Sequence, residues 1–351
     1  MKQELFLKEV LDQQRVLSRV LKYYLAGDGR TVLARAARLC ARAGRGPVFT
    51  GMGSSCYAPI ISAHILNSHA LPAAVWEAGE LLYYHLDGLG PDNVLVAVSQ
   101  SGRTIELRKI VSAVEGKMPI IGITNNTRSW LAQHSDVVLP LLAGVERMSS
   151  SKTYMNTIAV LSMLAWRSLG ALASDRKQQL LAVPALLGGV LHDAEERAGQ
   201  ALRFLGRPRF LHLVARGPSL STAMQAQVIL KEGAHILTEA QSGASFRHGP
   251  FEVISRGHRA MVFVPEGRTA KIMLDLVRDM AAQGSKVLLV TNAPAAETTG
   301  NIHVYPLPAV PEHVFPMLDI VPVEFLLLLL ARRKGMEPGA ITKGNKVTVR
   351  E

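Results

Sequence analysis

The sequence is poor in cysteine, in aromatic residues and in long apolar runs. Its 351 residues include two cysteines, Cys40 and Cys56, so neither a disulfide framework nor a cysteine-based metal site is expected. The longest apolar run, residues 325–331, is far shorter than the roughly 20 residues that span a bilayer and predicts a buried helix. The first residues lack the apolar segment of a signal peptide. We therefore expect a cytoplasmic protein that does not enter a membrane.

The charge of the chain is unbalanced but diffuse. Lys and Arg number 39 against 28 Asp and Glu, which gives a formal net charge of +11. Binding to a nucleic-acid backbone requires a concentrated basic stripe, and the densest basic cluster here is the short run Arg332-Arg333-Lys334. We expect no nucleic-acid partner and favour a small anionic ligand. A basic composition that affects only solubility is the alternative.

The length and the hydrophobic pattern predict two α/β domains. A chain of 351 residues is long enough for two domains of roughly 150 residues each. From residue 47 onwards, short apolar runs end in Gly, Ser or Asn and are followed by helical stretches, which is typical of βαβ units and a parallel sheet. Before that point, apolar residues recur at helical spacing and predict an amphipathic lead-in; they are Phe6, Val10, Leu17, Leu21 and Tyr24.

An internal repeat indicates that one α/β domain is duplicated. The run Gly-Arg-Thr occurs at 102–104 and again at 267–269, Ile-Thr-Asn at 123–125 is matched by Val-Thr-Asn at 290–292, and Val-Leu-Pro at 138–140 by Val-Tyr-Pro at 304–306. The offsets are 165, 167 and 166 residues. Such constant spacing is the signature of a repeat.

The predicted boundaries follow from this repeat. We expect a helical lead-in at 1–46, a first α/β domain at 47–170, a helical connection at 171–207, a second α/β domain at 208–334, and a C-terminal tail at 335–351 that closes the active site.

The strongest single motif is the run Ser99-Gln100-Ser101-Gly102-Arg103-Thr104, between an apolar strand at 94–98 and a predicted helix at 105–114. A turn at the carboxyl end of a parallel strand lies at the sheet edge where ligands bind, and the next helix offers free N–H groups. Three hydroxyls, one amide and a glycine at this place predict a phosphate site. The alternative is that the Ser and Thr side chains only cap the helix.

A second turn, Gly53-Ser54-Ser55, follows the predicted strand at 47–50 and suits another wall of the same pocket. In the second copy, Val264-Pro265-Glu266 precedes the repeated Gly-Arg-Thr, so the hydroxyls are replaced and a carboxylate is added. We therefore expect one copy to keep the phosphate site and each chain to bind one substrate.

Five short segments together resemble the tandem sugar-isomerase (SIS) family. They are Gly53-Ser54-Ser55, Ser99-Gln100-Ser101-Gly102-Arg103-Thr104, Ser151-Lys152-Thr153, Lys231-Glu232 and Arg247-His248-Gly249-Pro250. The family includes the isomerase half of glutamine–fructose-6-phosphate aminotransferase, aminosugar-phosphate deaminase/isomerases and fructosamine-6-phosphate deglycases. The resemblance runs from about residue 47 to the C-terminus. It implies two tandem SIS domains, each a doubly wound parallel sheet flanked by helices.

The resemblance also implies roles for individual residues. The sugar phosphate would be held by the two hydroxyl-rich turns, with contributions from Gly53, Ser54, Ser55, Ser99, Gln100, Ser101 and Thr104.

Three further residues would carry the chemistry. Glu232 would move a proton between C1 and C2, although a surface helix carboxylate is the alternative. His248 would open the sugar ring and would reach the site from a neighbouring subunit, which implies a homodimer. Lys346 would form an imine with the open-chain carbonyl or steady its charge, and Lys343 competes for this role. A disordered tail with solvated lysines is the alternative.

The resemblance thus implies an enzyme that isomerises, deaminates or deglycates a 6-phosphorylated sugar without a metal or organic cofactor. An isomerase of another anionic sugar, such as a sulfonated one, and a non-catalytic sugar-phosphate sensor are the alternatives. Two positions depart from the aminotransferase: Ile229 stands where that enzyme has a lysine, and Ser245 where it has a glutamate. Its glutaminase domain is not found in this sequence, which favours a catabolic direction.

Overall fold

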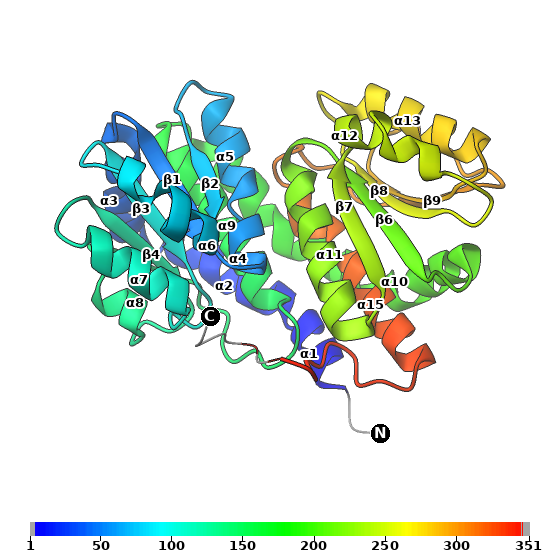
Figure 1. Cartoon of the computed structure of the whole chain (residues 1–351), viewed down its shortest axis with the longest axis horizontal. Coiled ribbons are helices and arrows are strands. Elements are labelled where there is room, and N and C mark those ends of the chain that lie inside the picture. Colours follow the sequence, from blue (N-terminus) through cyan, green and yellow to red (C-terminus); the bar gives the residue numbers. More distant parts are fainter. Residues whose placement is uncertain (1–3, 345, 347–351) are drawn as a thin grey trace. The chain divides into compact units, whose positions relative to one another are not determined.

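A computed structural model of the chain describes residues 4–344 and 346. Their contacts divide the chain into two compact units. We call the unit made of residues 12–182 and 342–351 the β1–β5 unit, and the unit made of residues 1–11 and 183–341 the β6–β10 unit. Each is built around a parallel five-stranded sheet with helices on both faces (Figure 1).

The sheet of the β1–β5 unit has the strand order β2-β1-β3-β4-β5. All four pairings are parallel. The three central strands are buried along their whole length, which fits their runs of β-branched and apolar residues. The strands are β1 (Gly46–Gly51), β2 (Ala74–Glu77), β3 (Asn93–Val98), β4 (Ile120–Thr124) and β5 (Val137–Pro140).

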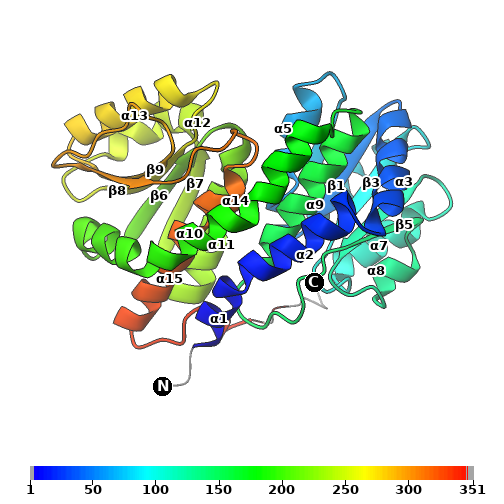
Figure 2. The ribbon, with the colours of Figure 1, turned by 180° about the vertical axis from the view of Figure 1, so that it is seen from behind.

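Two groups of helices cover this sheet. One apolar cluster joins β1, β3 and β4 to α6 (Ala78–Glu80), α7 (Ile105–Val114) and α8 (Trp130–Gln133). The long buried helix α9 lies on the other face, in contact with α2, α3, α4 and α5 (Figure 2). These elements are α2 (Gln13–Leu25), α3 (Gly29–Arg42), α4 (Ser54–Tyr57), α5 (Ile60–Asn67) and α9 (Lys152–Ser168); a π-helical turn, η1 (Leu81–His85), and a 3₁₀ turn, η2 (Leu86–Gly88), follow α6.

The β6–β10 unit repeats this plan. Its strand order is β10-β9-β8-β6-β7. When β6 to β10 are taken as the counterparts of β1 to β5, this is the order of the first sheet, β2-β1-β3-β4-β5, read in reverse. The helix α10 (Ser174–Leu205) leads into this unit. The strands are β6 (Phe210–Ala215), β7 (Leu237–Ser242), β8 (Arg259–Val264), β9 (Lys286–Thr291) and β10 (Ile302–Pro306).

The helices of this unit also lie on two faces of the sheet. Apolar residues of α12 and α13 pack with β6, β8, β9 and β10 in one cluster. Helix α11 contacts β6, β7 and α15. The elements are α1 (Leu5–Leu11), α11 (Leu220–Ala234), α12 (Gly243–Arg247), α13 (Ala270–Ala282), α14 (Pro316–Asp319) and α15 (Val321–Arg333), with the 3₁₀ turns η3 (Gly217–Ser219) and η4 (Pro250–Val253).

The predicted duplication and the α/β fold class are confirmed. The repeated runs at 123–125 and 290–292 stand at the carboxyl ends of β4 and β9, and those at 138–140 and 304–306 form the ends of β5 and β10. The helix predicted at 105–114 is α7. The run 325–331 lies in the largely buried helix α15. In the part of the chain that the structure describes, no helix is both long enough and apolar enough to cross a membrane.

A buried pair of histidines lies within the β6–β10 unit. His212 Nδ1 is 2.7 Å from His258 Nε2, and His258 Nδ1 is 2.7 Å from the Ser285 hydroxyl. Burial lowers the pKa of His258 to about 4, helped by repulsion from the His212 imidazole when that ring is protonated and from Arg259. Burial also lowers the pKa of His212, and the nearby carboxylate of Glu239 opposes that shift. Both imidazoles are therefore neutral in the folded protein at pH 7.

This pair predicts an acid-sensitive fold. Because the folded pKa of His258 lies below the unfolded value of 6.5, its stabilising effect is complete above pH 6.5 and is lost as the pH falls towards 4. We expect the loss to be on the order of 2 kcal/mol. Urea unfolding of the wild type and of His258→Gln between pH 7.5 and 4 tests this, with the exposed His192→Gln as control. The wild type and the control should lose more stability than His258→Gln; equal pH slopes would contradict the assignment.

Candidate functional site

The first hydroxyl-rich turn joins β3 to α7. Ser99 Oγ lies 2.9 Å from Thr104 Oγ1 and accepts a hydrogen bond from the amide of Gly102 at 3.1 Å. Thr104 occupies the N-cap position of α7, yet its side chain makes no capping hydrogen bond. The Ser99 and Thr104 hydroxyls therefore hold the turn together and do not cap the helix. The first N–H groups of α7 remain available at the same edge.

Gly102 allows this turn to lie close to the loop that follows β4. Its φ is +64°, a conformation that L side chains rarely adopt. A methyl group at this position would strike the side chain of Ser129 and lie 3.1 Å from Thr124 Oγ1. The same loop is tied to the turn because the carbonyl of Gln100 accepts hydrogen bonds from Thr124 Oγ1 and from the amide of Asn125. Glycine is thus required here by both conformation and space.

The second turn, between β1 and α4, lies beside the first because β1 and β3 are paired. Gly53 adopts φ +51° and is the N-cap of α4, and a methyl group on it would meet no atom within 4 Å. Ser54 and Ser55 form the first turn of α4 and are partly exposed. The predicted binding residues of both turns therefore gather at one sheet edge. They are Gly53, Ser54, Ser55, Ser99, Gln100, Ser101 and Thr104.

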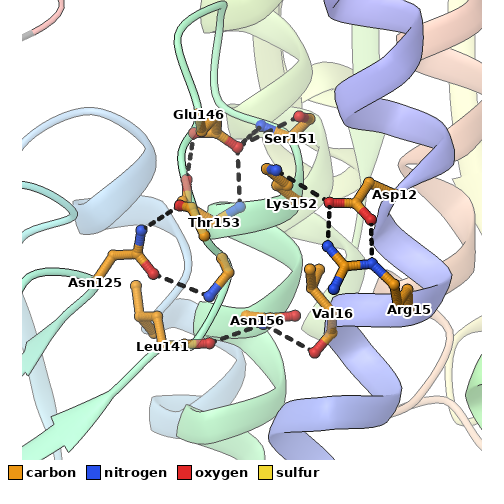
Figure 3. A network of polar contacts seen from close by, with 12 residues as sticks. Asp12, Arg15, Val16, Asn125, Leu141, Glu146, Ser151, Lys152, Thr153 and Asn156 are labelled. Atoms are coloured by element: carbon orange, nitrogen blue, oxygen red, sulfur yellow. Dashed lines mark hydrogen bonds and ion pairs between the residues drawn. The ribbon is translucent and has the colours of Figure 1, made fainter.

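A third segment at this edge, the loop after β5, is organised by the buried carboxylate of Glu146. Its Oε1 accepts hydrogen bonds from the amides of Ser151 and Thr153 at 3.1 and 2.9 Å and from Ser151 Oγ at 3.3 Å. Its Oε2 accepts one from Thr153 Oγ1 at 2.5 Å. Figure 3 shows these side chains around the first turn of α9. The side chain of Asn125 binds the same loop: it donates a hydrogen bond to the carbonyl of Gly144 and accepts one from the amide of Ala143.

Lys346 binds the same carboxylate from the C-terminal segment. Its ammonium lies 3.1 Å from Glu146 Oε2 and also donates to the carbonyls of Glu146 and Met148. The Glu146 side chain is fully buried and that of Lys346 is 23% exposed. These three acceptors match the three N–H donors of the ammonium. Lys343, the competing lysine, is exposed.

Lys152 is held on the other side of the α9 N-terminus. Its ammonium lies 3.1 Å from Asp12 Oδ2, and Arg15 binds the same carboxylate (Figure 3). Burial tends to raise the pKa of Asp12, but the hydrogen bonds from Arg15 and Lys152 outweigh it and hold that pKa below its usual value. Lys152 therefore connects the start of α9 to the start of α2, and the Asp12 carboxylate balances its positive charge.

The predicted proton carrier, Glu232, lies in the β6–β10 unit. It stands in the last turn of α11 and is partly buried. The chain after α15 packs directly against this turn, because the amide of Gly339 donates to the carbonyl of Gly233 and a methyl group on Gly233 would lie 2.8 Å from Gly339 Cα. The backbone around Glu232 is therefore tightly fixed.

His248 ends α12 in the same unit and is exposed. The turn that carries it is anchored on one side by Phe246, which is fully buried against His212 and Phe251. On the other side Arg247 pairs with Asp279 at 2.6 Å. Gly249 follows with φ +126°. The imidazole thus projects from a rigid turn into solvent, a position that suits contact with a ligand or a second chain.

The corresponding edge of the β6–β10 sheet carries carboxylates where the first carries hydroxyls. A methyl group on Gly267, the counterpart of Gly102, would lie 2.7 Å from Glu312 Oε2, and one on Gly217 would lie 3.1 Å from Glu312 Oε1. The buried Asp319 accepts hydrogen bonds from Ser219 and Thr222. Glu312 therefore covers both turns, and its charge disfavours a phosphate there.

Both halves of the chain match one protein family. The SIS domain family matches residues 48–167 and 208–345. The chain belongs to the SIS domain family. The matched regions cover almost all of the two sheets described above.

Individual relatives of this SIS protein are named as sugar-phosphate enzymes. The glutamine–fructose-6-phosphate aminotransferase of Pyrococcus horikoshii is 28% identical over 298 residues, 83% of this chain and 49% of that protein. The C-terminal domain of the Francisella tularensis glucosamine-fructose-6-phosphate aminotransferase superposes with a TM-score of 0.86 at 21% identity, covering 96% and 98% of the two chains. A Thermotoga maritima glucosamine-6-phosphate deaminase gives 0.77 at 19% identity, covering 98% and 99%. The chain spans about half the length of the curated relatives it matches.

The structure of this SIS protein adds residues that the sequence did not single out. Glu146, Asn125 and Glu312 position loops at the two sheet edges, and none was among the predicted residues. Glu146 stands five residues before Ser151 and has no motif of its own. Glu312 is the residue at offset 166 from Glu146, so the repeat could have indicated it.

Substitution of Gly102 tests the first turn. Gly102→Ala should destabilise the protein by about 3 kcal/mol, because the positive φ costs about 1 kcal/mol and the clash with Ser129 adds about 2. The matched control is Gly116→Ala, which has φ +73° and open space around it, and it should show only the conformational cost. Urea unfolding measures both, and equal effects would contradict the close approach at Gly102.

A double-mutant cycle tests the Lys346 contact. Glu146→Gln keeps an acceptor for the amides of Ser151 and Thr153, while Lys346→Met removes the ammonium. We expect a coupling energy of about 1–2 kcal/mol between the two substitutions in chemical unfolding. Strict additivity would show that Lys346 and Glu146 do not interact.

Proposed function

We propose that this protein is an enzyme that binds a 6-phosphorylated sugar and transfers a proton between its C1 and C2, as an aminosugar- or fructosamine-6-phosphate deaminase, deglycase or isomerase. The observation that carries the proposal is the pair of hydroxyl-rich turns after β1 and β3, which gather donors at one sheet edge, while Glu312 covers the matching turns in the second copy. The enzymes named among its relatives, an aminotransferase and a deaminase of such sugars, support the same substrate class.

The phosphate would be bound by the two turns. Hydroxyls of Ser55, Ser99, Ser101 and Thr104 and the amide of Gln100 supply donors, and the N-terminus of α7 favours negative charge. The backbone can approach the phosphate closely at Gly53 and Gly102 because neither carries a side chain.

The proton transfer would use Glu232. Its carboxylate removes the proton from C2 of the open-chain aldose, which gives an enediol or enolamine, and returns it to C1. For a 2-amino sugar the product is an imine at C2. Water adds to this carbon and ammonia leaves, so the net reaction is hydrolytic deamination with isomerisation.

Ring opening and charge stabilisation would fall to two further residues. His248, exposed on its anchored turn, can exchange a proton with the ring oxygen, and we propose that it serves the site of a second copy in a homodimer. We propose Lys346 as the site lysine in place of Lys343, because Lys346 is held by Glu146 and Met148. Its ammonium would steady the developing oxyanion once it exchanges one of its three present acceptors for that oxygen.

The test of the proton carrier uses Glu232→Gln. The variant should bind glucosamine 6-phosphate with wild-type affinity but lose at least about a thousandfold in turnover, because the amide is no base. Incubation of the protein with the 6-phosphates of glucosamine, galactosamine, fructose and fructosamine in deuterated water, followed by NMR, measures exchange at C1 and C2 and amine release. The exposed Glu297→Gln is the control.

Two outcomes would count against the proposal. Wild-type exchange by Glu232→Gln would remove that residue from the mechanism. Tight binding without exchange or release for every sugar of the panel would instead indicate a sensor or a sugar with another anionic group.

A further inference from the structure

A basic cavity lies in the β6–β10 unit, at the opposite sheet edge from the turns that follow β6 and β8. It has a volume of about 1000 Å³, at the upper end of the range for small-molecule sites. Residues from the end of α10, the segment between α10 and β6, the end of α11, the start of β7 and the end of α15 line it. Five of its lining residues are cationic, namely Arg203, Arg207, Arg209, Arg333 and Lys334. Among the described residues that line it there is no Asp or Glu.

Two of these cations have an evident structural role. Lys334 Nζ donates to the carbonyls of Ala234 and His235 at 2.9 and 2.8 Å, and an Arg333 nitrogen donates to the carbonyl of Gly206 at 3.1 Å. They satisfy carbonyls at the ends of α11 and α10, where a helix favours positive charge. Because backbone carbonyls already bind Arg333 and Lys334, these two residues are no evidence for a bound ligand.

The other three arginines are different. Arg203, Arg207 and Arg209 are exposed, and within residues 4–344 the structure records no hydrogen bond or ion pair for their guanidinium groups. By contrast, Arg332, just outside the cavity, is bound by both Glu4 and Glu195. Three guanidinium groups that line one cavity, without a carboxylate among its described lining residues, suit the binding of phosphate oxygens.

The cavity also has an apolar wall. Leu202, Ile236 and Leu330 are buried there, and Leu237 is 68% exposed. An exposed leucine beside uncompensated arginines suits a ligand that combines an organic body with several negative charges. A bare inorganic ion would use only part of this surface.

The cavity is separate from the proposed catalytic turn of the same unit. It lies at the amino ends of β6 and β7, next to Leu237, whereas His248 follows the carboxyl end of β7. The six residues of β7 span roughly 17 Å at about 3.3 Å per residue. A molecule in the cavity would thus not touch His248. Glu232, by contrast, stands in the last turn of α11, three residues before the lining residue His235.

We propose that this cavity is a second anion site that binds a multiply charged phosphate ester with an organic body, in addition to the sugar phosphate of the proposed function. Arg203, Arg207 and Arg209 hold its phosphates, and the leucine wall contacts its organic part.

Calorimetric titration of the full chain with ADP and with pyrophosphate tests this. The wild type should bind both probes saturably, and ADP more tightly because it also covers the apolar wall. Arg207→Ala/Arg209→Ala should weaken ADP binding by at least about tenfold. The double variant Lys271→Ala/Arg278→Ala removes two exposed charges from α13 and should bind ADP as the wild type does. Ser101→Ala should also leave ADP binding unchanged, which distinguishes this cavity from the sugar-phosphate turns.

Three results would overturn the proposal. One is the absence of saturable binding of either probe at millimolar concentration. The second is undiminished ADP binding by Arg207→Ala/Arg209→Ala, with its fold verified by circular dichroism. The third is binding of a short RNA through the same arginines much more tightly than ADP, which would assign the surface to a nucleic acid.

Discussion

All strands of each sheet run in the same direction, and this constraint determines where chemistry can occur. Because every strand pairing is parallel, the turns that leave β1, β3, β4 and β5 open at one edge of their sheet. Residues far apart in sequence, such as Ser54, Ser99 and Glu146, are thereby brought to the same edge. The duplicated sheet has the same edge, so the difference between the two copies comes from side chains and not from backbone topology.

Buried carboxylates fix the loops in both copies. Glu146 is tolerated in the interior because amides, hydroxyls and the Lys346 ammonium all donate to it. Within the described part of the chain, Asp319 accepts hydrogen bonds from two hydroxyls, and burial raises its pKa to about 8 although these bonds from Thr222 and Ser219 work against that shift. The Glu146 carboxylate thus binds both the start of α9 and the Lys346 ammonium. The Asp319 carboxyl connects α14 to η3 and to the start of α11.

The fold and the first turn could be predicted from sequence, because both depend on local patterns. Alternating apolar runs and helical stretches indicate βαβ units, and the run from Ser99 to Thr104 lies directly after a strand. The contacts of Glu146 with Lys346 could not be predicted, since they join residues 200 positions apart through long-range packing. The sequence motif predicts Glu266 as the carboxylate that replaces the hydroxyls in the second copy. In the structure Glu312 covers the turns instead. The position of Glu312 depends on the path of the loop after β10, which the motif does not reveal.

We propose that one sheet edge binds the sugar phosphate and that its duplicated counterpart does not. Amide NMR spectra of the protein, recorded during titration with glucosamine 6-phosphate, test it most directly. The resonances of Ser101, Gly102 and Thr104 should shift and saturate together, while those of Gly267 and Thr269 should not respond. Shifts at 267–269 with none at 101–104 would contradict it.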